Sequence, residues 1–324
     1  MFKQLSLFFL LARNVSSFSV TNPTDGNISG KLQNTKSLDN AYGLSSRNGK
    51  IQQYRRQSQQ LMCGLVAAID DVWSQKSGTT FSDVPLLNDY EKEGNENKVL
   101  TETTQKLHHR GPDGMTVANG LLGEDSAKAR WAMGHTRLAI VDPNNRKADM
   151  PFQLDFEVKG ETKTVKLAAN GEIYNHEKVY SDLVQKDGWN HDRISQSDCE
   201  VIAHSFAQNG GPATAKALDG MFAFVIFEEN QADGTVKAFA ARDPVGIKPL
   251  YYGRKSSSDD ESQASSYVFS SELKALVGQV DPETVVAIPP GHYWTPEEGL
   301  VCFYNPDWLR KVRNPQIFYQ SVVI

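Results

Sequence analysis

The sequence predicts an α+β fold in which helices pack outside stacked antiparallel sheets. Apolar runs typical of strands outnumber the amphipathic runs typical of helices. The predicted helices also come in pairs between blocks of strands, a pattern that favours layered sheets covered by helices. The chain of 324 residues is long enough for one large domain or two ordinary ones.

Periodicity, turn residues and stop signals place the individual elements. The predicted strands are Gly64–Ile69, Thr116–Leu122, Met133–Val141, Phe152–Phe156, Thr164–Ala169, Met221–Phe227, Val236–Ala241, Tyr251–Tyr252, Tyr267–Ser270 and Cys302–Tyr304. The predicted helices are Lys98–His109, His176–Gln185 and Asp198–Gln208. Lys159-Gly160 is the expected turn of a hairpin, and Ser74–Asn97 and Arg254–Ser266 are the expected surface loops.

Composition excludes several classes of function. With 39% hydrophobic and 23% charged residues the chain resembles a soluble globular protein. A net charge of -5 disfavours binding to a phosphate backbone, so we expect no nucleic-acid partner. Cys63, Cys199 and Cys302 form no CxxC pair, which argues against a disulfide framework or a zinc site and fits a reducing compartment.

Residues 1–61 differ from the rest of the chain. The apolar run Leu5–Ala12 is too short to span a membrane but has the size of a signal-peptide core. Residues 22–60 are rich in Asn, Ser, Gln and Gly, so we expect a disordered extension or presequence. Two interpretations remain: a presequence for a plastid or other organelle, or upstream sequence wrongly joined to a cytoplasmic protein that starts at Met62.

Met62-Cys63-Gly64 is the order expected of an N-terminal nucleophile before processing. Methionine is removed when the next residue is small, and the free α-amine of Cys63 would titrate at roughly 7.7–8.0. That amine can take the proton from the thiol of its own residue, so one residue supplies nucleophile and base. The alternative is that Cys63 is an ordinary buried cysteine at the start of a core strand.

Other polar residues interrupt apolar segments. Arg137 lies in a predicted strand, so it is either paired or at an edge, and its guanidinium suits a small-molecule carboxylate. Asn170 and Gly171 can supply two donors to one oxygen, as in an oxyanion hole. The alternative for 169–176 is an ordinary strand–loop–helix connection with Asn175 as the helix N-cap.

Ser197-Asp198-Cys199-Glu200 fits a capping box at a helix start. The alternative is that Asp198 holds the ammonium group of a ligand. Two further segments, 218–224 and 241–251, are interpreted as structural: a turn into a core strand and a loop shaped by Gly and Pro.

Taken together, these segments resemble the glutaminase domain of glutamine-hydrolysing asparagine synthetase, a class II glutamine amidotransferase. The resemblance rests on order and spacing over almost all of residues 62–308. The matching segments are MCG at 62–64, HRGPD at 109–113, HTRLAIVD at 135–142, NGEIYNH at 170–176, SDCEVIAH at 197–204, LDGMFAFV at 218–225, ARDPVGIKPLYYG at 241–253, SSELKAL at 270–276 and PPGHYW at 289–294.

The resemblance implies an N-terminal nucleophile (Ntn) hydrolase fold, a four-layer αββα sandwich of antiparallel sheets. It also implies a role for each matching residue. Cys63 matches the nucleophile that forms a γ-glutamyl thioester, and Asn170 and Gly171 match the oxyanion hole. Arg137 matches the residue that binds the glutamine carboxylate, and Glu172 and Asp198 match those that hold its α-amine.

The resemblance further implies glutamine as substrate, ammonia delivery to a synthetase domain or subunit for asparagine biosynthesis, and a homodimer. No metal, cofactor or membrane contact is expected of this domain, because ATP and Mg belong to the synthetase domain. The sequence departs from the family in several ways, chiefly that residues precede Cys63, that the synthetase domain is missing, and that residues 309–324 form a divergent tail. Two alternatives therefore remain, a non-catalytic truncated paralogue that keeps the fold as a binding or regulatory module, and another class II amidotransferase.

Overall fold

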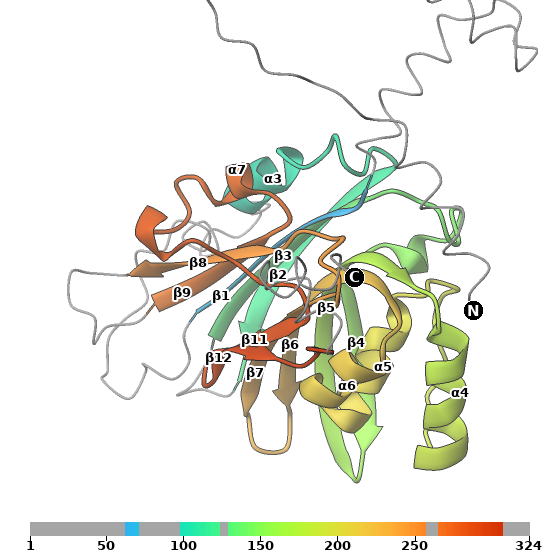
Figure 1. Cartoon of the computed structure of the whole chain (residues 1–324). Coiled ribbons are helices and arrows are strands. Elements are labelled where there is room, and N and C mark those ends of the chain that lie inside the picture. The colour runs from blue at the N-terminus through green and yellow to red at the C-terminus, as the bar shows by residue number, and fades with distance from the viewer. Residues whose placement is uncertain (1–61, 71–97, 124–128, 257–264, 307–324) are drawn as a thin grey trace, which may run out of the picture. The chain divides into compact units, whose positions relative to one another are not determined.

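The computed structural model describes residues 62–70, 98–123, 129–256 and 265–306 (Figure 1). The predictions for 1–61, Ser74–Asn97 and 309–324 lie outside these residues. The strands are β1 (Gly64–Asp70), β2 (Gly114–Leu122), β3 (Ala129–Arg137), β4 (Phe152–Val158), β5 (Glu161–Ile173), β6 (Gly220–Asn230), β7 (Val236–Arg242), β8 (Tyr251–Ser256), β9 (Ser265–Ser270), β10 (Val286–Ala287), β11 (His292–Thr295) and β12 (Gly299–Cys302). The helices are α3 (Lys98–Gln105), α4 (His176–Asp187), α5 (Glu200–Asn209), α6 (Gly211–Ala217) and α7 (Leu273–Leu276), with 3-10 turns at Arg146–Ala148 and Pro282–Thr284.

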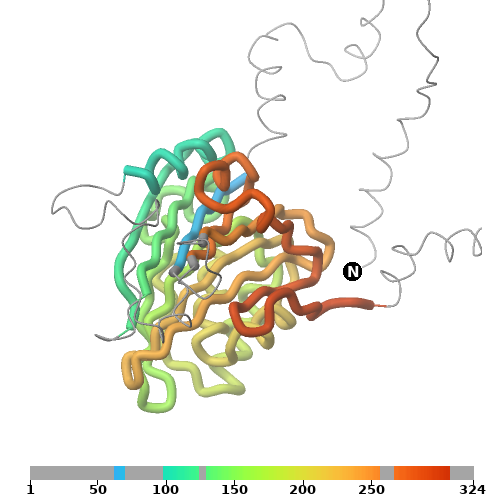
Figure 2. Tube along the Cα trace, turned by 90° about the vertical axis from the view of Figure 1, so that its left-hand side faces the viewer, coloured from blue at the N-terminus to red at the C-terminus, as the bar shows by residue number. Residues whose placement is uncertain are grey.

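The strands form two six-stranded sheets in which the recorded pairs are antiparallel. The first sheet has the order β10-β8-β9-β1-β3-β2, and the second has the order β12-β11-β7-β6-β5-β4. The sheets contact each other through β1 and β3 of the first and β5 of the second. Figure 2 shows the trace of the two sheets from the side, turned by 90° from the view of Figure 1.

Three apolar cores separate four layers. One core lies between the sheets, one lies between the second sheet and helices α4, α5 and α6, and one lies between the first sheet and helices α3 and α7. These layers are the predicted αββα sandwich, so the expected α+β, Ntn-type architecture is confirmed. Within the described residues no helix combines the length and apolar character needed to cross a membrane.

Strand β1 shows why its sequence is almost entirely apolar. Leu65, Ala67 and Ile69 point into the core between the sheets, whereas Val66 and Ala68 point toward α3 and α7. Side chains alternate along a strand, and a central strand with a core on each face needs apolar residues at successive positions. The predicted buried strand is therefore confirmed, and it places Cys63 directly before a rigid central strand.

The prediction of a helix over Lys98–His109 is wrong at its end. Helix α3 stops at Gln105, and the chain continues in tighter turns, with Leu107 N donating to Thr104 O (2.9 Å) and Arg110 N to Leu107 O (2.9 Å). Leu107 is fully buried and its carbonyl accepts a hydrogen bond from Thr136 Oγ1 (3.1 Å). Packing against β3 thus takes precedence over helix continuation.

The predicted strand Met133–Val141 is also too long, because β3 ends at Arg137. Both strands that pair with β3 have their first residue at this point: Gly114 of β2 pairs with Arg137, and Gly64 of β1 pairs with Thr136. Beyond Arg137 there is no ladder partner among the described strands, and the chain wraps around the Arg137 guanidinium instead.

Other boundaries differ by a few residues. The hairpin about Lys159-Gly160 is confirmed, but β5 continues to Ile173 and therefore contains Asn170, Gly171 and Glu172. The predicted loop Arg254–Ser266 is partly strand, since β8 reaches Ser256 and β9 begins at Ser265. The predicted strand Cys302–Tyr304 is shifted, because β12 ends at Cys302.

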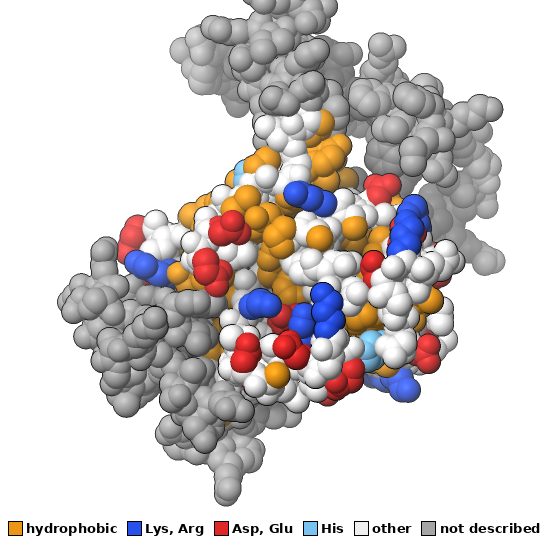
Figure 3. Space-filling view, turned by 90° about the horizontal axis from the view of Figure 1, so that it is seen from below, with side chains coloured by type: hydrophobic (Ala, Val, Ile, Leu, Met, Phe, Trp, Pro, Cys, Tyr) orange, Lys and Arg blue, Asp and Glu red, His pale blue; other side chains and the backbone are white. Residues whose placement is uncertain are grey.

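Acidic and basic side chains are interspersed on the face seen in Figure 3.

Candidate active site

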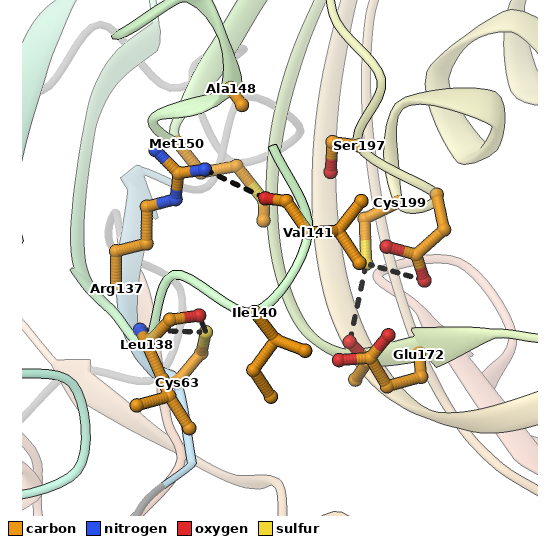
Figure 4. Close-up of a pocket in the computed structure, with 12 residues that line it drawn as sticks. Cys63, Arg137, Leu138, Ile140, Val141, Ala148, Met150, Glu172, Ser197 and Cys199 are labelled. Carbon is orange, nitrogen blue, oxygen red and sulfur yellow. Dashed lines mark hydrogen bonds between the residues drawn. The ribbon is translucent and has the colours of Figure 1, made fainter. Parts of the chain in front are cut away.

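The six residues proposed from the sequence come together around two adjoining pockets. One pocket is lined by five of them: Cys63, Arg137, Gly171, Glu172 and Asp198. The other is lined by Cys63, Asn170, Gly171, Glu172 and Lys248, among others. Cys63 lies on the wall shared by both. Figure 4 shows Cys63 and Arg137 on one side of the first pocket and Glu172 and Cys199 on the other.

The backbone around Cys63 is held on both sides. Arg110 donates from Nε to the Cys63 carbonyl oxygen (3.1 Å), and the Arg110 carbonyl accepts from Met62 N (2.8 Å). Arg110 is itself buried and pairs through Nη1 with Glu272 (2.9 Å). The sulfur of Cys63 accepts a hydrogen bond from Leu138 N (3.3 Å), the first residue after β3. The sulfur is thus fixed at the junction of β1 and β3.

The groups around Cys63 have opposing effects on the pKa of its thiol. Burial raises the pKa of the Cys63 thiol, and the nearby Glu172 carboxylate raises it further. The Leu138 N–H, Lys248 and Arg137 act in the opposite direction and lower this pKa. Removing a thiolate from water costs free energy unless donors and cations replace the water. The state of this thiol therefore depends on a few specific neighbours.

Arg137 is paired and buried, one of the two outcomes expected for an arginine in an apolar strand. Its guanidinium donates to Asp149 Oδ1 (2.7 Å) and to the carbonyls of Asn145 (3.1 Å), Val141 (2.9 Å) and Asp142 (2.7 Å). These bonds use the four N–H groups of Nη1 and Nη2 and leave Nε–H as the donor without a recorded partner among the described residues. Arg137 therefore shapes the 138–149 loop that forms one wall of the pocket.

Asn170 is the most unusual polar residue of the site. It is 1% exposed, yet neither its Nδ2 nor its Oδ1 has a hydrogen-bond partner within the described structure. Leaving a buried amide unsatisfied costs about 1–3 kcal/mol, so such groups need an explanation. The adjacent carbonyl of Ala169 accepts a hydrogen bond from His135 Nε2 (2.9 Å), and burial lowers the pKa of His135 to about 4. Neutral His135 thus ties β3 to β5 beside Asn170.

Gly171 lies where the two strands β5 and β6 approach closely. A Cβ at this position would lie 2.1 Å from Met221 O and 2.7 Å from the Cα of Phe222. No residue with a side chain fits there without a backbone shift. The glycine therefore allows β5 to lie this close to β6. Its neighbours Asn170 and Glu172 line the pocket.

Glu172 and Asp198 both line the first pocket and lie close enough to interact electrostatically. Burial and the nearby Asp198 charge raise the pKa of Glu172 to about 7, although Lys248 lowers it. Asp198 is 6% exposed and accepts a hydrogen bond from Ile173 N (2.5 Å), which couples its loop to the end of β5. Two carboxylates that line one pocket make this part of it acidic.

The predicted capping box at Ser197–Glu200 is wrong. The N-cap of α5 is Cys199 and has no side-chain cap, and the fully buried Glu200 accepts from Ile194 N (2.6 Å) and Ser195 N (2.9 Å). Asn175 does precede α4, but its side chain bonds Ala217 O and Asp219 N instead of capping the helix. Neither Asp198 nor Asn175 is therefore used as a capping side chain.

Sequence reasoning missed Lys248, which lies in the 241–251 segment interpreted as a purely structural loop. Residues 243–250 are indeed an irregular loop, but it brings Lys248 to the pocket lined by Cys63 and Asn170. A lysine between Gly/Pro turns carries no periodic signal. The one available indication was a long cationic side chain next to the apolar residues Ile247 and Leu250.

Comparisons with known proteins were consistent with this geometry. The family model for a glutamine amidotransferase domain matches residues 86–291, a range that contains all of the six site residues except Cys63. Asparagine synthetase [glutamine-hydrolyzing] 3 of Arabidopsis thaliana is 37% identical over 227 residues, which cover 69% of this chain and 33% of that protein. Asparagine synthetase [glutamine-hydrolyzing] of Zea mays is 38% identical over 211 residues, 64% of this chain and 30% of that protein.

A solved structure, the glutamine phosphoribosylpyrophosphate amidotransferase of B. subtilis with ADP and GMP, matches 75% of this chain and 50% of its own at 20% identity and a TM-score of 0.46. The present chain spans about a third of the length of the curated relatives it matches. It belongs to the glutamine amidotransferase domain family, and its domain is of the asparagine synthetase type.

Proposed function

We propose that this domain hydrolyses the side-chain amide of glutamine to glutamate and ammonia through a thioester on Cys63. The observation that carries the proposal is the buried Asn170 amide without a partner, in a pocket that Cys63 also lines. An amide donor held unsatisfied in the resting protein suits a negative charge that exists only during the reaction. Gly171 N–H is the second proposed donor.

The proposed chemistry proceeds in two steps. With Met62 removed, the α-amine of Cys63 takes the thiol proton, the sulfur attacks the amide carbon of glutamine, and an oxyanion forms toward Asn170. Collapse of this intermediate breaks the C–N bond, and the protonated amine transfers its proton to the departing ammonia. Water then attacks the thioester, which releases glutamate and restores the thiol.

The two charged groups on the α-carbon of glutamine are each assigned a partner in the pocket. Arg137 is proposed to bind the carboxylate through its Nε–H and its positive charge, and Glu172 and Asp198 are proposed to hold the α-ammonium. The support is that these three residues and Cys63 line one pocket. Recognition of both charged groups would distinguish glutamine from simple primary amides.

The relatives that match this chain are named asparagine synthetases, glutamine-hydrolyzing. We therefore infer that ammonia from this site serves the ATP-dependent conversion of aspartate to asparagine, in a synthetase domain or subunit to which ATP and Mg would bind. The direct test is release of glutamate and ammonia from glutamine by protein that begins at Cys63, with Cys63→Ser as the control. An inactive but folded protein would favour the non-catalytic paralogue.

Arg137→Ala should weaken glutamine binding severely and also lower the stability of the fold. Removing one member of a buried ion pair typically costs about 3–5 kcal/mol, and here the 138–149 loop also loses its central donor. The measurement is the KM for glutamine together with the melting temperature. Asp149→Asn is the matched control, since it removes the ion pair but keeps the cation, and it should lower stability with a smaller effect on KM. An unchanged KM in Arg137→Ala would remove Arg137 from the substrate site.

Glutamine binding should weaken as the pH falls below about 7. Because the pKa of Glu172 is raised to about 7, the carboxylate takes up a proton in this range and loses its attraction for the α-ammonium. The same shift means that ionised Glu172 opposes folding above pH 7, so Glu172→Gln should raise the melting temperature at pH 8 while raising KM. A pH-independent KM, or a destabilised Glu172→Gln protein, would contradict this assignment.

A further inference from the structure

Lys248 is a buried lysine beside the candidate nucleophile. It is 6% exposed and lines the same pocket as Cys63 and Asn170. Its Nζ donates a hydrogen bond to Met62 Sδ (3.2 Å), the residue directly before Cys63. Lysines are almost never fully buried unless they are paired, and a thioether sulfur is only a weak acceptor. The ammonium is therefore held in a place where its own hydrogen bonding is poor.

The loop that carries Lys248 is fixed by two other residues. Asp243, which is fully buried, accepts from the backbone N of Gly246 (2.6 Å), Ile247 (3.0 Å) and Lys248 (3.0 Å). Arg242 donates from Nε to the Lys248 carbonyl (2.7 Å). Both backbone groups of Lys248 are thus anchored. A loop secured in this way holds its side chain at a fixed place in the pocket, despite the poor partner at its end.

The charged groups around Lys248 differ in whether they are already bonded to other parts of the protein. Arg137 and Arg110 also lie within electrostatic range of Cys63 or Lys248, but their guanidinium groups already bond the 138–149 loop, Cys63 O and Glu272. Asp243 is occupied by its own loop, and Glu172, whose charge disfavours a thiolate, faces both Cys63 and Lys248. The other neighbouring thiol, that of Cys199, is buried. Lys248 is therefore the cation that faces the pocket without a carboxylate bonded to it among the described residues.

We propose that Lys248 is a positioning residue that holds a positive charge beside the Cys63 sulfur and favours its anionic form. The ammonium offsets the Glu172 carboxylate, and it lies in the same pocket in which an oxyanion would meet Asn170. Removal of Met62 would free the Lys248 hydrogen bond that now goes to Met62 Sδ. The catalytic meaning of this role rests on the proposed glutaminase function, but its effect on the thiol does not.

The test measures the rate at which iodoacetamide alkylates Cys63 as a function of pH, followed on the Cys63 peptide by mass spectrometry. The full chain of residues 1–324 is used, since the measurement needs no glutaminase activity. Alkylation requires the thiolate. Lys248→Met should slow alkylation of Cys63 at pH 7 by about tenfold and move the profile to higher pH, because a nearby opposite charge commonly shifts a pKa by roughly one unit or more.

Three further proteins make the result decisive. Lys248→Arg should keep the wild-type profile, because it keeps the charge. Lys237→Met, at the opposite end of β7 and paired with Glu228 (3.0 Å), is the matched control and should leave the profile unchanged. Lys248→Met should melt at or above the wild-type temperature because it removes a poorly partnered buried charge with little change of volume. Lys248→Gln gives the same comparison if the methionine variant does not fold.

A folded neutral variant whose alkylation profile coincides with that of the wild type would overturn the proposal. A shifted profile, together with no glutamine hydrolysis by protein that begins at Cys63, would instead count against the proposed function and leave the role of Lys248 intact. The two hypotheses therefore fail in different measurements.

Discussion

Protein that begins at Cys63 should release glutamate from glutamine, whereas the unprocessed chain of residues 1–324 should not. In the unprocessed chain the nitrogen of Cys63 is a peptide amide, which has no basic lone pair near neutral pH. The thiol then lacks its base, and a free thiol with a pKa of about 8.5 is only a few per cent thiolate at pH 7.

Met62 adds a second obstacle in the unprocessed chain. Its side chain lines the pocket of Cys63 and Asn170 and accepts the hydrogen bond from Lys248 Nζ (3.2 Å). Its backbone N donates to Arg110 O (2.8 Å), so the residue is held in place rather than free to swing aside. Loss of Met62 therefore produces the amine and opens the pocket at once.

The comparison needs two proteins, residues 1–324 and residues 62–324, with removal of Met62 in the second confirmed by mass. Cys63→Ser in the shorter protein is the control, because serine keeps the amine but is a far weaker nucleophile. Equal glutamate release by an unprocessed long chain would sink the N-terminal nucleophile assignment, since a thiol in mid-chain would need another base.

The second large effect is expected at Asn170. Asn170→Ala should slow turnover by roughly 10²–10³ while leaving glutamine binding nearly intact, the usual effect of deleting one oxyanion donor. The variant should also fold at least as well as the wild type, because it removes a buried amide that has no partner in the resting protein.

The matched control is Asn209→Ala, at the exposed C-terminal end of α5, the end opposite the pocket residues Asp198 and Cys199, which should not change kcat. Single-turnover and steady-state rates separate binding from chemistry. If KM rises in Asn170→Ala while kcat holds, then Asn170 is a ground-state contact and the oxyanion assignment is wrong.

Much of the sandwich was predictable because its central strands are apolar on both faces. In β6, Phe222, Phe224 and Ile226 face the helices, and Val225 and Phe227 face the other sheet, so a continuous apolar run indicated a buried strand. The end of β3 was not predictable in this way. Leu138, Ile140 and Val141 continue the apolar pattern, but their conformation depends on the Arg137 side chain and on the end of the neighbouring strands.

The site was predictable to the extent that its residues lie in motifs. The order and spacing of the segments around Cys63, Arg137, Asn170 and Asp198 indicate these residues without knowledge of the fold. Lys248 was missed because its place in the pocket depends on hydrogen bonds that its backbone makes with the side chains of Asp243 and Arg242. The wrong capping box has a similar cause, since Glu200 turns back toward Ile194 and Ser195.

The central claim, that Cys63 becomes acylated by glutamine, is tested most directly by trapping the intermediate. Protein of residues 62–324 with Met62 removed is mixed with glutamine, quenched in acid within one turnover, digested and analysed by mass spectrometry. The account predicts a γ-glutamyl thioester on the Cys63 peptide that decays as glutamate appears, and that accumulates less in Asn170→Ala. Glutamate release without a γ-glutamyl group on Cys63, or with that group on Cys199 or Cys302 instead, would contradict it.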